Sequence, residues 1–148
     1  MKIPCCAAGY MLEKDAILSK ISIIKNCLKS IVRAKDMEEG AIDEIFLDDI
    51  ISVNLQRAVQ ACIDIAHIII AQKGLKLPAT YKESFGILAK EKIITGSIAS
   101  TMMKMVGFRN IAVHEYQAVD DTIMMSIIEC HLKDFEVYYT QIYEYIND

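Results

Sequence analysis

Residues 109–116 hold the side chains of this sequence that are best suited to chemistry: an arginine, an asparagine, a histidine and a tyrosine. Arginine is a permanent planar cation that suits phosphate oxygens. Histidine can accept or give a proton near neutral pH. Asparagine can orient a ligand, and a tyrosine hydroxyl can donate or accept a hydrogen bond or be modified. The four residues are Arg109, Asn110, His114 and Tyr116.

These side-chain types meet the needs of RNA backbone cleavage. A base removes the proton of the 2′-hydroxyl group, an acid protonates the leaving 5′ oxygen, and a cation stabilises the charged phosphorane. No metal ion is required for these steps. The same residue types also occur as a helix-end arginine, a buried histidine and an amphipathic tyrosine without any chemistry. The pattern alone leaves both interpretations open.

On an ideal helix the polar residues fall on two edges of one broad face. Arg109 and Tyr116 share one edge, and Asn110 and His114 share the other. The apolar residues of the segment are expected to point the opposite way, into the protein, and these are Phe108, Ile111 and Ala112. Arg109 and His114 lie roughly 140° apart. They could converge through a helix break near Gly107, through the reach of arginine, or across a dimer axis.

A basic stretch leads into this polar segment, although the whole chain has a net charge of −4. Residues 73–109 carry seven basic side chains and two acidic ones, whereas residues 110–148 carry one lysine and eight acids. A basic field beside a polar site favours an anionic ligand such as phosphate. We therefore assign Lys104 to substrate binding. The acidic end of the chain is less expected of an RNA-binding protein.

Helical periodicity dominates the sequence, and no alternating strand pattern competes with it. The pattern predicts an all-α, antiparallel up-down bundle of about five helices, in which shorter helices bridge two long pairs. Gly74 is expected to end the second helix, and Thr80 and Thr95 are expected to begin the third and fourth. The second helix is predicted to begin near Asp43 or Asp48 and to end at residue 73. The other predicted helices are residues 11–34, 80–91, 96–106 (with residues 108–116 as a helical continuation or turn) and 121–145.

Length and composition fit one domain at residues 11–148, preceded by an N-terminal extension at residues 1–10 that could be poorly ordered. The chain is 53% hydrophobic and contains eight methionines, which indicates apolar surface buried against a second subunit or, alternatively, a large isoleucine-rich core. No run of eighteen apolar residues predicts a membrane helix. Five cysteines without C-x-x-C spacing fit a reducing cytoplasm.

Several single residues have predicted roles outside this segment. The apolar helical faces are expected to bury Cys27, Cys62 and Cys130 as small hydrophobic side chains, and His131 as a core histidine. Asp64 and His67 have a spacing that metal centres use, but one such pair is weak and no metal is expected. Asp64 is instead expected to form a hydrogen bond near the cleft or to a neighbouring helix, and we also assign it to substrate binding.

Three separated segments resemble one known family. Residues 107–116 resemble the R-x4-H-x-Y signature of the HEPN superfamily, specifically of its HepT toxin branch. Residues 61–67 resemble the central-helix pattern of that branch, and residues 77–85 resemble its Pro-Thr-Tyr…Phe connector. The resemblance covers roughly residues 11–146, and the predicted order of helices is also that of the family.

The resemblance implies a metal-independent endoribonuclease without a cofactor, working as a homodimer with its site between the subunits. His114 would be the catalytic general acid and base, Arg109 the ligand of the phosphate and transition state, and Asn110 the polar residue that follows the arginine. Tyr116 matches a tyrosine to which a partner antitoxin, a minimal nucleotidyltransferase, adds AMP groups in type VII-like systems. Phosphates added beside Arg109 would fill its anion site and repel RNA.

Two other functions fit parts of the same pattern. A non-catalytic subunit that binds a nucleotide or substrate for a separate nucleotidyltransferase would use the same arginine and basic stretch, but needs no proton transfer. A structural helical dimer would need none of the four polar residues at 109, 110, 114 and 116.

Overall fold

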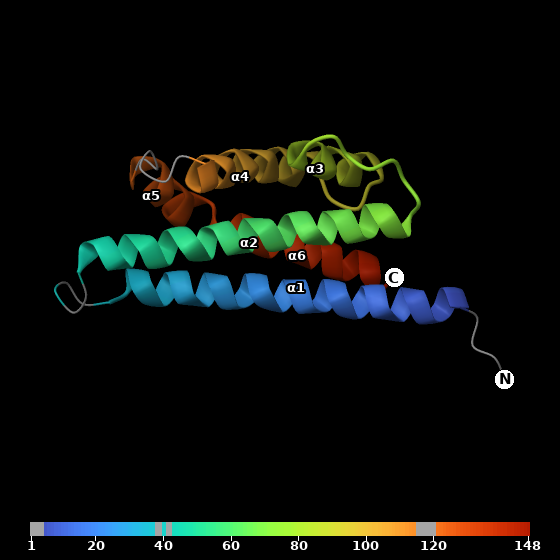
Figure 1. Cartoon of the computed structure of the whole chain (residues 1–148), viewed down its shortest axis with the longest axis horizontal. Helices are drawn as coiled ribbons and strands as arrows, with labels where there is room; N and C mark the ends of the chain where they lie inside the picture. The colour runs from blue at the N-terminus through green and yellow to red at the C-terminus, as the bar shows by residue number, and fades with distance from the viewer. Residues whose placement is uncertain (1–4, 38–39, 41–42, 115–120) are drawn as a thin grey trace.

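A computed structural model describes the backbone of residues 5–37, 40, 43–114 and 121–148, and the side chains of residues 13–37, 40, 43–111 and 126–148. Six helices and no strand occur in these residues, which confirms the all-α prediction. The helices are α1 (Cys5–Lys35), α2 (Glu44–Gln72), α3 (Tyr81–Lys90), α4 (Gly96–His114), α5 (Asp121–Cys130) and α6 (Leu132–Ile146). Both described chain ends lie at the same end of the bundle (Figure 1).

Two long antiparallel helices, α1 and α2, form the base of the fold (Figure 1). The apolar stripes of the two helices face each other, and every member is buried: Ile17, Ile21, Ile24, Leu28 and Ile31 on α1, and Ile51, Leu55, Ala58, Cys62, Ile65 and Ile69 on α2. Burying one such isoleucine contributes roughly 1.5–3 kcal/mol. α1 begins at Cys5, six residues before its predicted start at residue 11.

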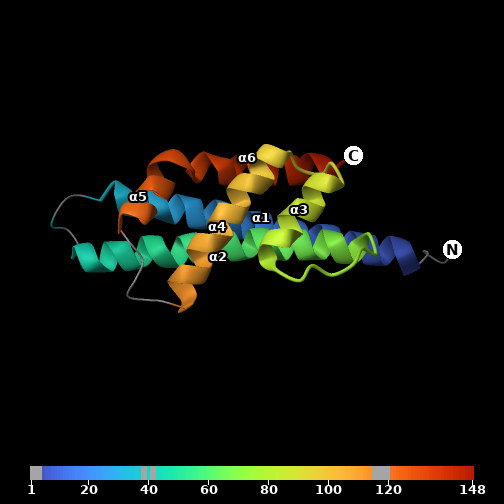
Figure 2. The same ribbon diagram turned by 90° about the horizontal axis from the view of Figure 1, so that it is seen from above.

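The predicted last helix is two helices, α5 and α6, separated at His131. α6 runs beside α1 and buries Phe135, Tyr138 and Ile142 (Figure 2). The prediction of a core histidine is wrong, because the His131 side chain is 43% exposed and its Nδ1 atom lies 2.8 Å from Oδ2 of Asp134. His131 is therefore paired with a carboxylate in the first turn of α6 and lies outside the core.

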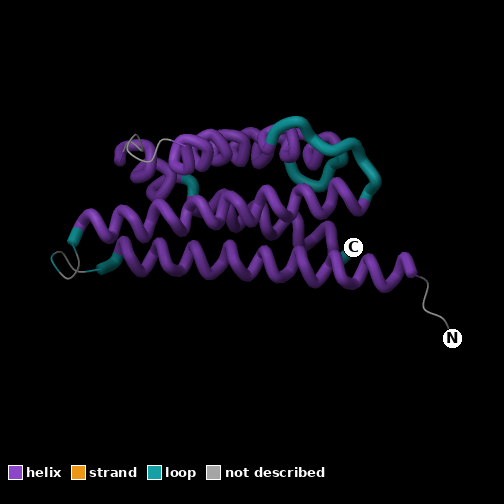
Figure 3. The backbone as a smooth tube through the Cα atoms, in the orientation of Figure 1, coloured by secondary structure: helices purple, strands orange, loops and turns teal. Residues whose placement is uncertain are grey.

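A second layer, made of α3 and α4, crosses over α2 (Figure 2). The loop of residues 73–80 leads into it, and Gly74 takes a φ of +67°, a left-handed conformation that glycine adopts at little cost (Figure 3). The predicted capping box at Thr80 is present, since Thr80 Oγ1 accepts from the backbone N–H of Glu83 at 3.2 Å. The Glu83 carboxylate accepts from the backbone of Ala79 at 2.8 Å, one residue earlier than in the standard motif.

α4 begins at the predicted cap, where Thr95 Oγ1 accepts from the backbone N–H of Ile98 at 3.3 Å. It continues through Gly107 to His114 without a break, so the described backbone offers no bend that brings residues 109 and 114 together. Phe108 is buried as predicted, but Ile111 is 41% exposed and its inward prediction is wrong. The C-terminal end of α4 extends past α2 (Figure 2).

Cys27 and Cys62 are buried and free, as predicted, whereas Cys130 is exposed and its prediction is wrong. Burial raises the pKa of the Cys27 thiol and raises that of Cys62 well above its ordinary value. Within the described residues, no helix is long and apolar enough to cross a membrane.

Candidate functional site

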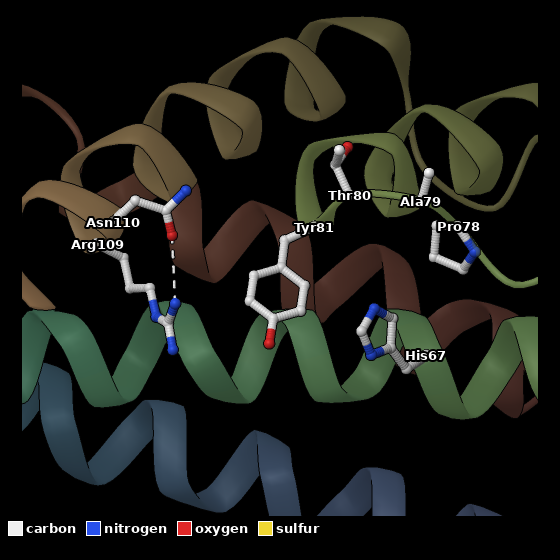
Figure 4. Close-up of a pocket in the computed structure, with 7 residues that line it drawn as sticks. All are labelled: His67, Pro78, Ala79, Thr80, Tyr81, Arg109 and Asn110. Carbon is white, nitrogen blue, oxygen red and sulfur yellow. Dashed lines mark hydrogen bonds between the residues drawn. The ribbon is translucent and has the colours of Figure 1, made fainter. Parts of the chain in front are cut away.

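An open cavity of about 650 Å³ lies between α2, α4 and the start of α3 (Figure 4). Its lining combines His67 of α2 with the end of the 73–80 loop, Tyr81 of α3, and Arg109 and Asn110 of α4. Two of the predicted site residues therefore meet at one cavity. The lining residues are His67, Pro78, Ala79, Thr80, Tyr81, Arg109 and Asn110.

The Arg109 side chain is held on three sides. Its Nη2 atom donates to Oε1 of Gln60 at 2.9 Å, and its Nη1 atom donates to Oδ1 of Asn110 at 3.2 Å. Its guanidinium carbon lies 5.3 Å from the centroid of the Tyr81 ring, within cation–π range. A guanidinium has five N–H donors, and these two hydrogen bonds leave others for an anionic ligand.

A chain of hydrogen bonds extends from Arg109 through α2 to α1. Gln60 Nε2 donates to Oδ1 of Asp64 at 2.9 Å, and Lys20 Nζ donates to Oδ2 of the same carboxylate at 3.0 Å. An ionised carboxylate only accepts, so the amide nitrogen of Gln60 faces Asp64 and its carbonyl oxygen is left for Arg109. Asp64 thus bonds to a neighbouring helix, as expected, and lies behind Arg109 rather than in the cavity lining.

Tyr81 lies between Arg109 and His67 (Figure 4). The centroids of the Tyr81 and His67 rings are 5.7 Å apart, with the rings inclined at 49°. His67 Nε2 lies 3.0 Å from Oγ of Ser84, which is fully buried and donates to the backbone oxygen of Thr80 at 3.5 Å. His67 Nε2 and Ser84 Oγ share a hydrogen bond whose donor is set by the tautomer of the His67 ring.

Lys82 brings a second positive charge close to α4. Its Nζ atom lies 3.8 Å from the point where a Cβ atom would stand on Gly107, one helical turn before Asn110. Lys104 is exposed on α4 and is not part of the cavity lining. The predicted basic stretch therefore contributes Lys82 as well as Arg109 to the surroundings of the cavity.

The two remaining predicted residues lie at the edge of the described region. His114 is the last residue of α4, one turn beyond Asn110 on the same edge, and its side chain lies outside the described residues. Tyr116 lies outside them entirely. Among the described side chains, no three of histidine, cysteine, aspartate or glutamate are grouped as a metal site.

Sequence reasoning missed Gln60 and Tyr81 as parts of this cavity. Gln60 had one signal, since it interrupts the apolar run of α2, but only the crossing of α4 over α2 gives it a partner. Tyr81 follows the predicted helix start at Thr80 and lies in the connector of residues 77–85, but neither pattern gives it a role in a site. Its contact with Arg109 depends on how α3 packs against α4.

The helices and the cavity together define an all-α protein with a candidate anion site, where the guanidinium of Arg109 faces a lining that contains no carboxylate. Comparison with known proteins adds the family. Residues 12–142 match the model of the family described as ribonuclease HepT-like, and the chain belongs to that family.

Three relatives are informative. The mRNA nuclease HepT of Shewanella oneidensis is 40% identical over 122 residues, which cover 82% of this chain and 92% of that protein. The tRNA nuclease HepT of Aphanizomenon flos-aquae is 33% identical over 92 residues, 62% of this chain and 63% of that protein. A solved structure of the tri-AMPylated HEPN toxin of Shewanella oneidensis in complex with an MNT antitoxin has a TM-score of 0.80 at 40% identity, covering 88% of this chain and 98% of that one.

Proposed function

We propose that the protein is a metal-independent endoribonuclease and the toxin of a toxin–antitoxin pair. The observation that carries the proposal is the anchored Arg109, which faces an open cavity five residues before His114 in an intact R-x4-H-x-Y segment. The membership in the ribonuclease HepT-like family supports it, as do the two related nucleases.

In the proposed reaction His114 takes the proton of the 2′-hydroxyl group, and the 2′ oxygen attacks the adjacent phosphorus. The bond to the 5′ oxygen breaks, that oxygen takes a proton from a His114 imidazolium, and the products are a 2′,3′-cyclic phosphate and a 5′-hydroxyl end. Arg109 stabilises the charge that develops on the phosphoryl oxygens, while Asn110 orients both Arg109 and the substrate. Lys104 and Lys82 attract the RNA backbone, and Asp64 acts through Gln60 rather than by direct contact.

We also propose that the protein works as a homodimer. Along the unbroken α4 the positions of Arg109 and His114 lie roughly 140° apart, so a second subunit supplies the missing half of each site. An exposed apolar surface supports this arrangement: Phe46, Ile50 and Val53 share one face of α2 and are 62%, 37% and 49% exposed. Sedimentation of the purified chain is expected to give twice the monomer mass.

A cognate nucleotidyltransferase is the proposed antitoxin, and Tyr116 the residue that it modifies with AMP. The tri-AMPylated relative bound to its MNT antitoxin supports this regulation. Phosphates attached two residues beyond His114 would occupy the anion site at Arg109 and repel RNA. Intact-mass measurement after co-expression is expected to show increments of one AMP each, all lost in Tyr116→Phe. An unchanged mass of the parent with an authentic partner would contradict the modification.

The activity itself is tested by incubating the purified chain with RNA in the presence of EDTA. Cleavage that yields cyclic phosphate ends is expected, because no step needs a metal ion. Nucleotide binding without any cleavage would contradict the proposed ribonuclease activity. It would favour the alternative function, a nucleotide-binding or substrate-binding subunit of a nucleotidyltransferase.

A further inference from the structure

We propose that the part of the cavity formed by His67, Tyr81 and Thr80 is a nucleobase subsite. It rests on the proposed function, because it would hold the base of the nucleotide whose phosphate binds Arg109. The cavity is continuous from Arg109 and Asn110 to His67, so one ligand can reach both ends (Figure 4).

Three planar groups follow one another along this cavity. The guanidinium of Arg109 lies 5.3 Å from the Tyr81 ring centroid, and that ring lies 5.7 Å from the His67 ring. Tyr81 is 39% exposed, so part of its ring is open to a ligand. Proteins that bind single-stranded RNA place its unstacked bases against aromatic, histidine and guanidinium planes of this kind.

A polar edge accompanies the planar groups. His67 uses Nε2 in its hydrogen bond with the buried Ser84, which leaves Nδ1 for a ligand. No hydrogen bond to Nδ1 occurs among the residues that the structure describes. Thr80 uses its Oγ1 atom to accept from Glu83, and its hydroxyl proton remains available as a donor. The lining thus supplies a ring nitrogen of His67 and a hydroxyl donor of Thr80, groups that can pair with a base that carries an amino group and a ring nitrogen, such as adenine.

The charge of the lining also fits a nucleotide. The described lining has one fixed cation, Arg109, and no carboxylate. Lys82 extends the positive field along α4 at Gly107. A phosphate at Arg109 with a neutral ring at His67 satisfies both ends of the cavity, whereas an acidic peptide would leave the aromatic end unused.

The test is calorimetric titration of the full chain with three probes: 5′-AMP, ribose 5-phosphate and inorganic phosphate. Stacking on aromatic groups makes 5′-AMP bind roughly fivefold to 150-fold more tightly than ribose 5-phosphate. In His67→Ala this preference is expected to fall severalfold, because one stacking plane and one ring nitrogen are lost while Tyr81 remains. The affinity for inorganic phosphate is expected to stay at the parental value because Arg109 is untouched.

Two further variants make the result specific. His131→Ala removes a histidine of similar partial exposure at the α5–α6 junction, away from the cavity, and is expected to keep the full preference. His67→Phe keeps a planar ring without ring nitrogens, and its preference is expected to lie between those of the parent and His67→Ala. His67→Phe also tests the subsite if the alanine variant fails to fold. Thermal melting checks the fold of each variant.

Equal affinities for 5′-AMP and ribose 5-phosphate in the parent would overturn the subsite, as would a full preference in a folded His67→Ala. The result is separate from the proposed function. A chain that prefers 5′-AMP through His67 but leaves RNA intact would reject the ribonuclease and keep the subsite. A chain that cuts RNA without any such preference would reject the subsite alone.

Discussion

The Nη2 atom of Arg109 donates a 2.9 Å hydrogen bond to the amide oxygen of Gln60, a residue 49 positions earlier in the chain. This bond joins α4 to the middle of α2. Asp64 and Lys20 fix the orientation of the amide from behind. The guanidinium that we propose for phosphate binding is therefore oriented by residues from three helices before any ligand arrives, which is the preorganisation that catalysis on a phosphodiester needs.

Gln60→Ala is expected to lower the cleavage rate by about tenfold to a hundredfold, because a misplaced charge loses most of its effect on the transition state. Steady-state kinetics with RNA in excess over the protein measures the rate. The loss should appear mainly in kcat, since Arg109 remains present to bind phosphate. Gln56→Ala is the matched control: Gln56 lies one turn earlier on α2 and donates to Oγ of Ser52, outside the cavity. A Gln60 variant no slower than the control would reject the orienting role.

Arg109→Lys is expected to impair cleavage although it keeps the positive charge. An ammonium group cannot reproduce the planar fork that contacts Gln60, Asn110 and a phosphate at once. Removal of one charge-stabilising donor costs roughly a hundredfold to a thousandfold in rate in comparable sites. Cleavage assays at saturating RNA measure the loss, and a lysine variant within twofold of the parent would show that charge alone suffices.

Tyr138→Phe is expected to destabilise the fold without entering the site. The Tyr138 hydroxyl is buried and donates to the backbone oxygen of Cys62 at 2.9 Å, joining α6 to α2. Loss of one such bond costs about 1 kcal/mol, which corresponds to a fall in Tm of about 2–4 °C for a chain of this length. Tyr143→Phe is the control, because Tyr143 is 52% exposed. Equal melting temperatures for the two variants would contradict the buried bond.

Stability is expected to fall in alkaline solution. Burial, followed by the influence of Cys27 and Asp64, raises the pKa of the Cys62 thiol well above its ordinary value of 9.0, and burial likewise raises the pKa of Tyr138 above 10.0. Both groups keep their protons in the folded chain but lose them in the unfolded chain above these ordinary values. The stabilising contribution is therefore complete below about pH 9 and is lost as the pH rises.

Urea titrations at about pH 8 and about pH 10.5 measure this dependence through the free energy of unfolding. Cys62→Ala should show a smaller alkaline loss than the parent. Cys130→Ala should follow the parent, because this thiol is exposed. An identical pH dependence for the parent and Cys62→Ala would remove the thiol from the explanation.

The sequence predicted the parts of this fold that depend on local chemistry. The helix starts at Thr80 and Thr95 were predicted from side chains that cap a helix, and Asp43 was one of two predicted starts of α2. All three caps are present. The break at His131 was not predictable, because no proline or glycine marks it. Ile111 was assigned to the core from its position on the helix, but its side chain is exposed. Whether a residue of α4 is buried depends on how α4 packs against other helices, and the periodicity of one helix carries no information about that packing.

In the candidate site, too, some residues could be predicted from the sequence and others could not. Arg109 and Asn110 were found from residue type and spacing, and the structure places both at one cavity. Gln60 and Tyr81 come from other helices, and their contacts with Arg109 exist only through the crossing of α4 with α2 and α3. Residues that orient a catalytic group from a distance carry little signal of their own in one sequence.

The most direct test of the central claim compares RNA cleavage by the purified parent chain and by His114→Ala, each without its nucleotidyltransferase partner and with EDTA present. The proposal predicts cyclic phosphate products from the parent and no cleavage above background from the variant, because no other group replaces the acid and base. Thermal melting should show both proteins folded. A folded His114→Ala variant that cuts RNA as fast as the parent would contradict the assignment.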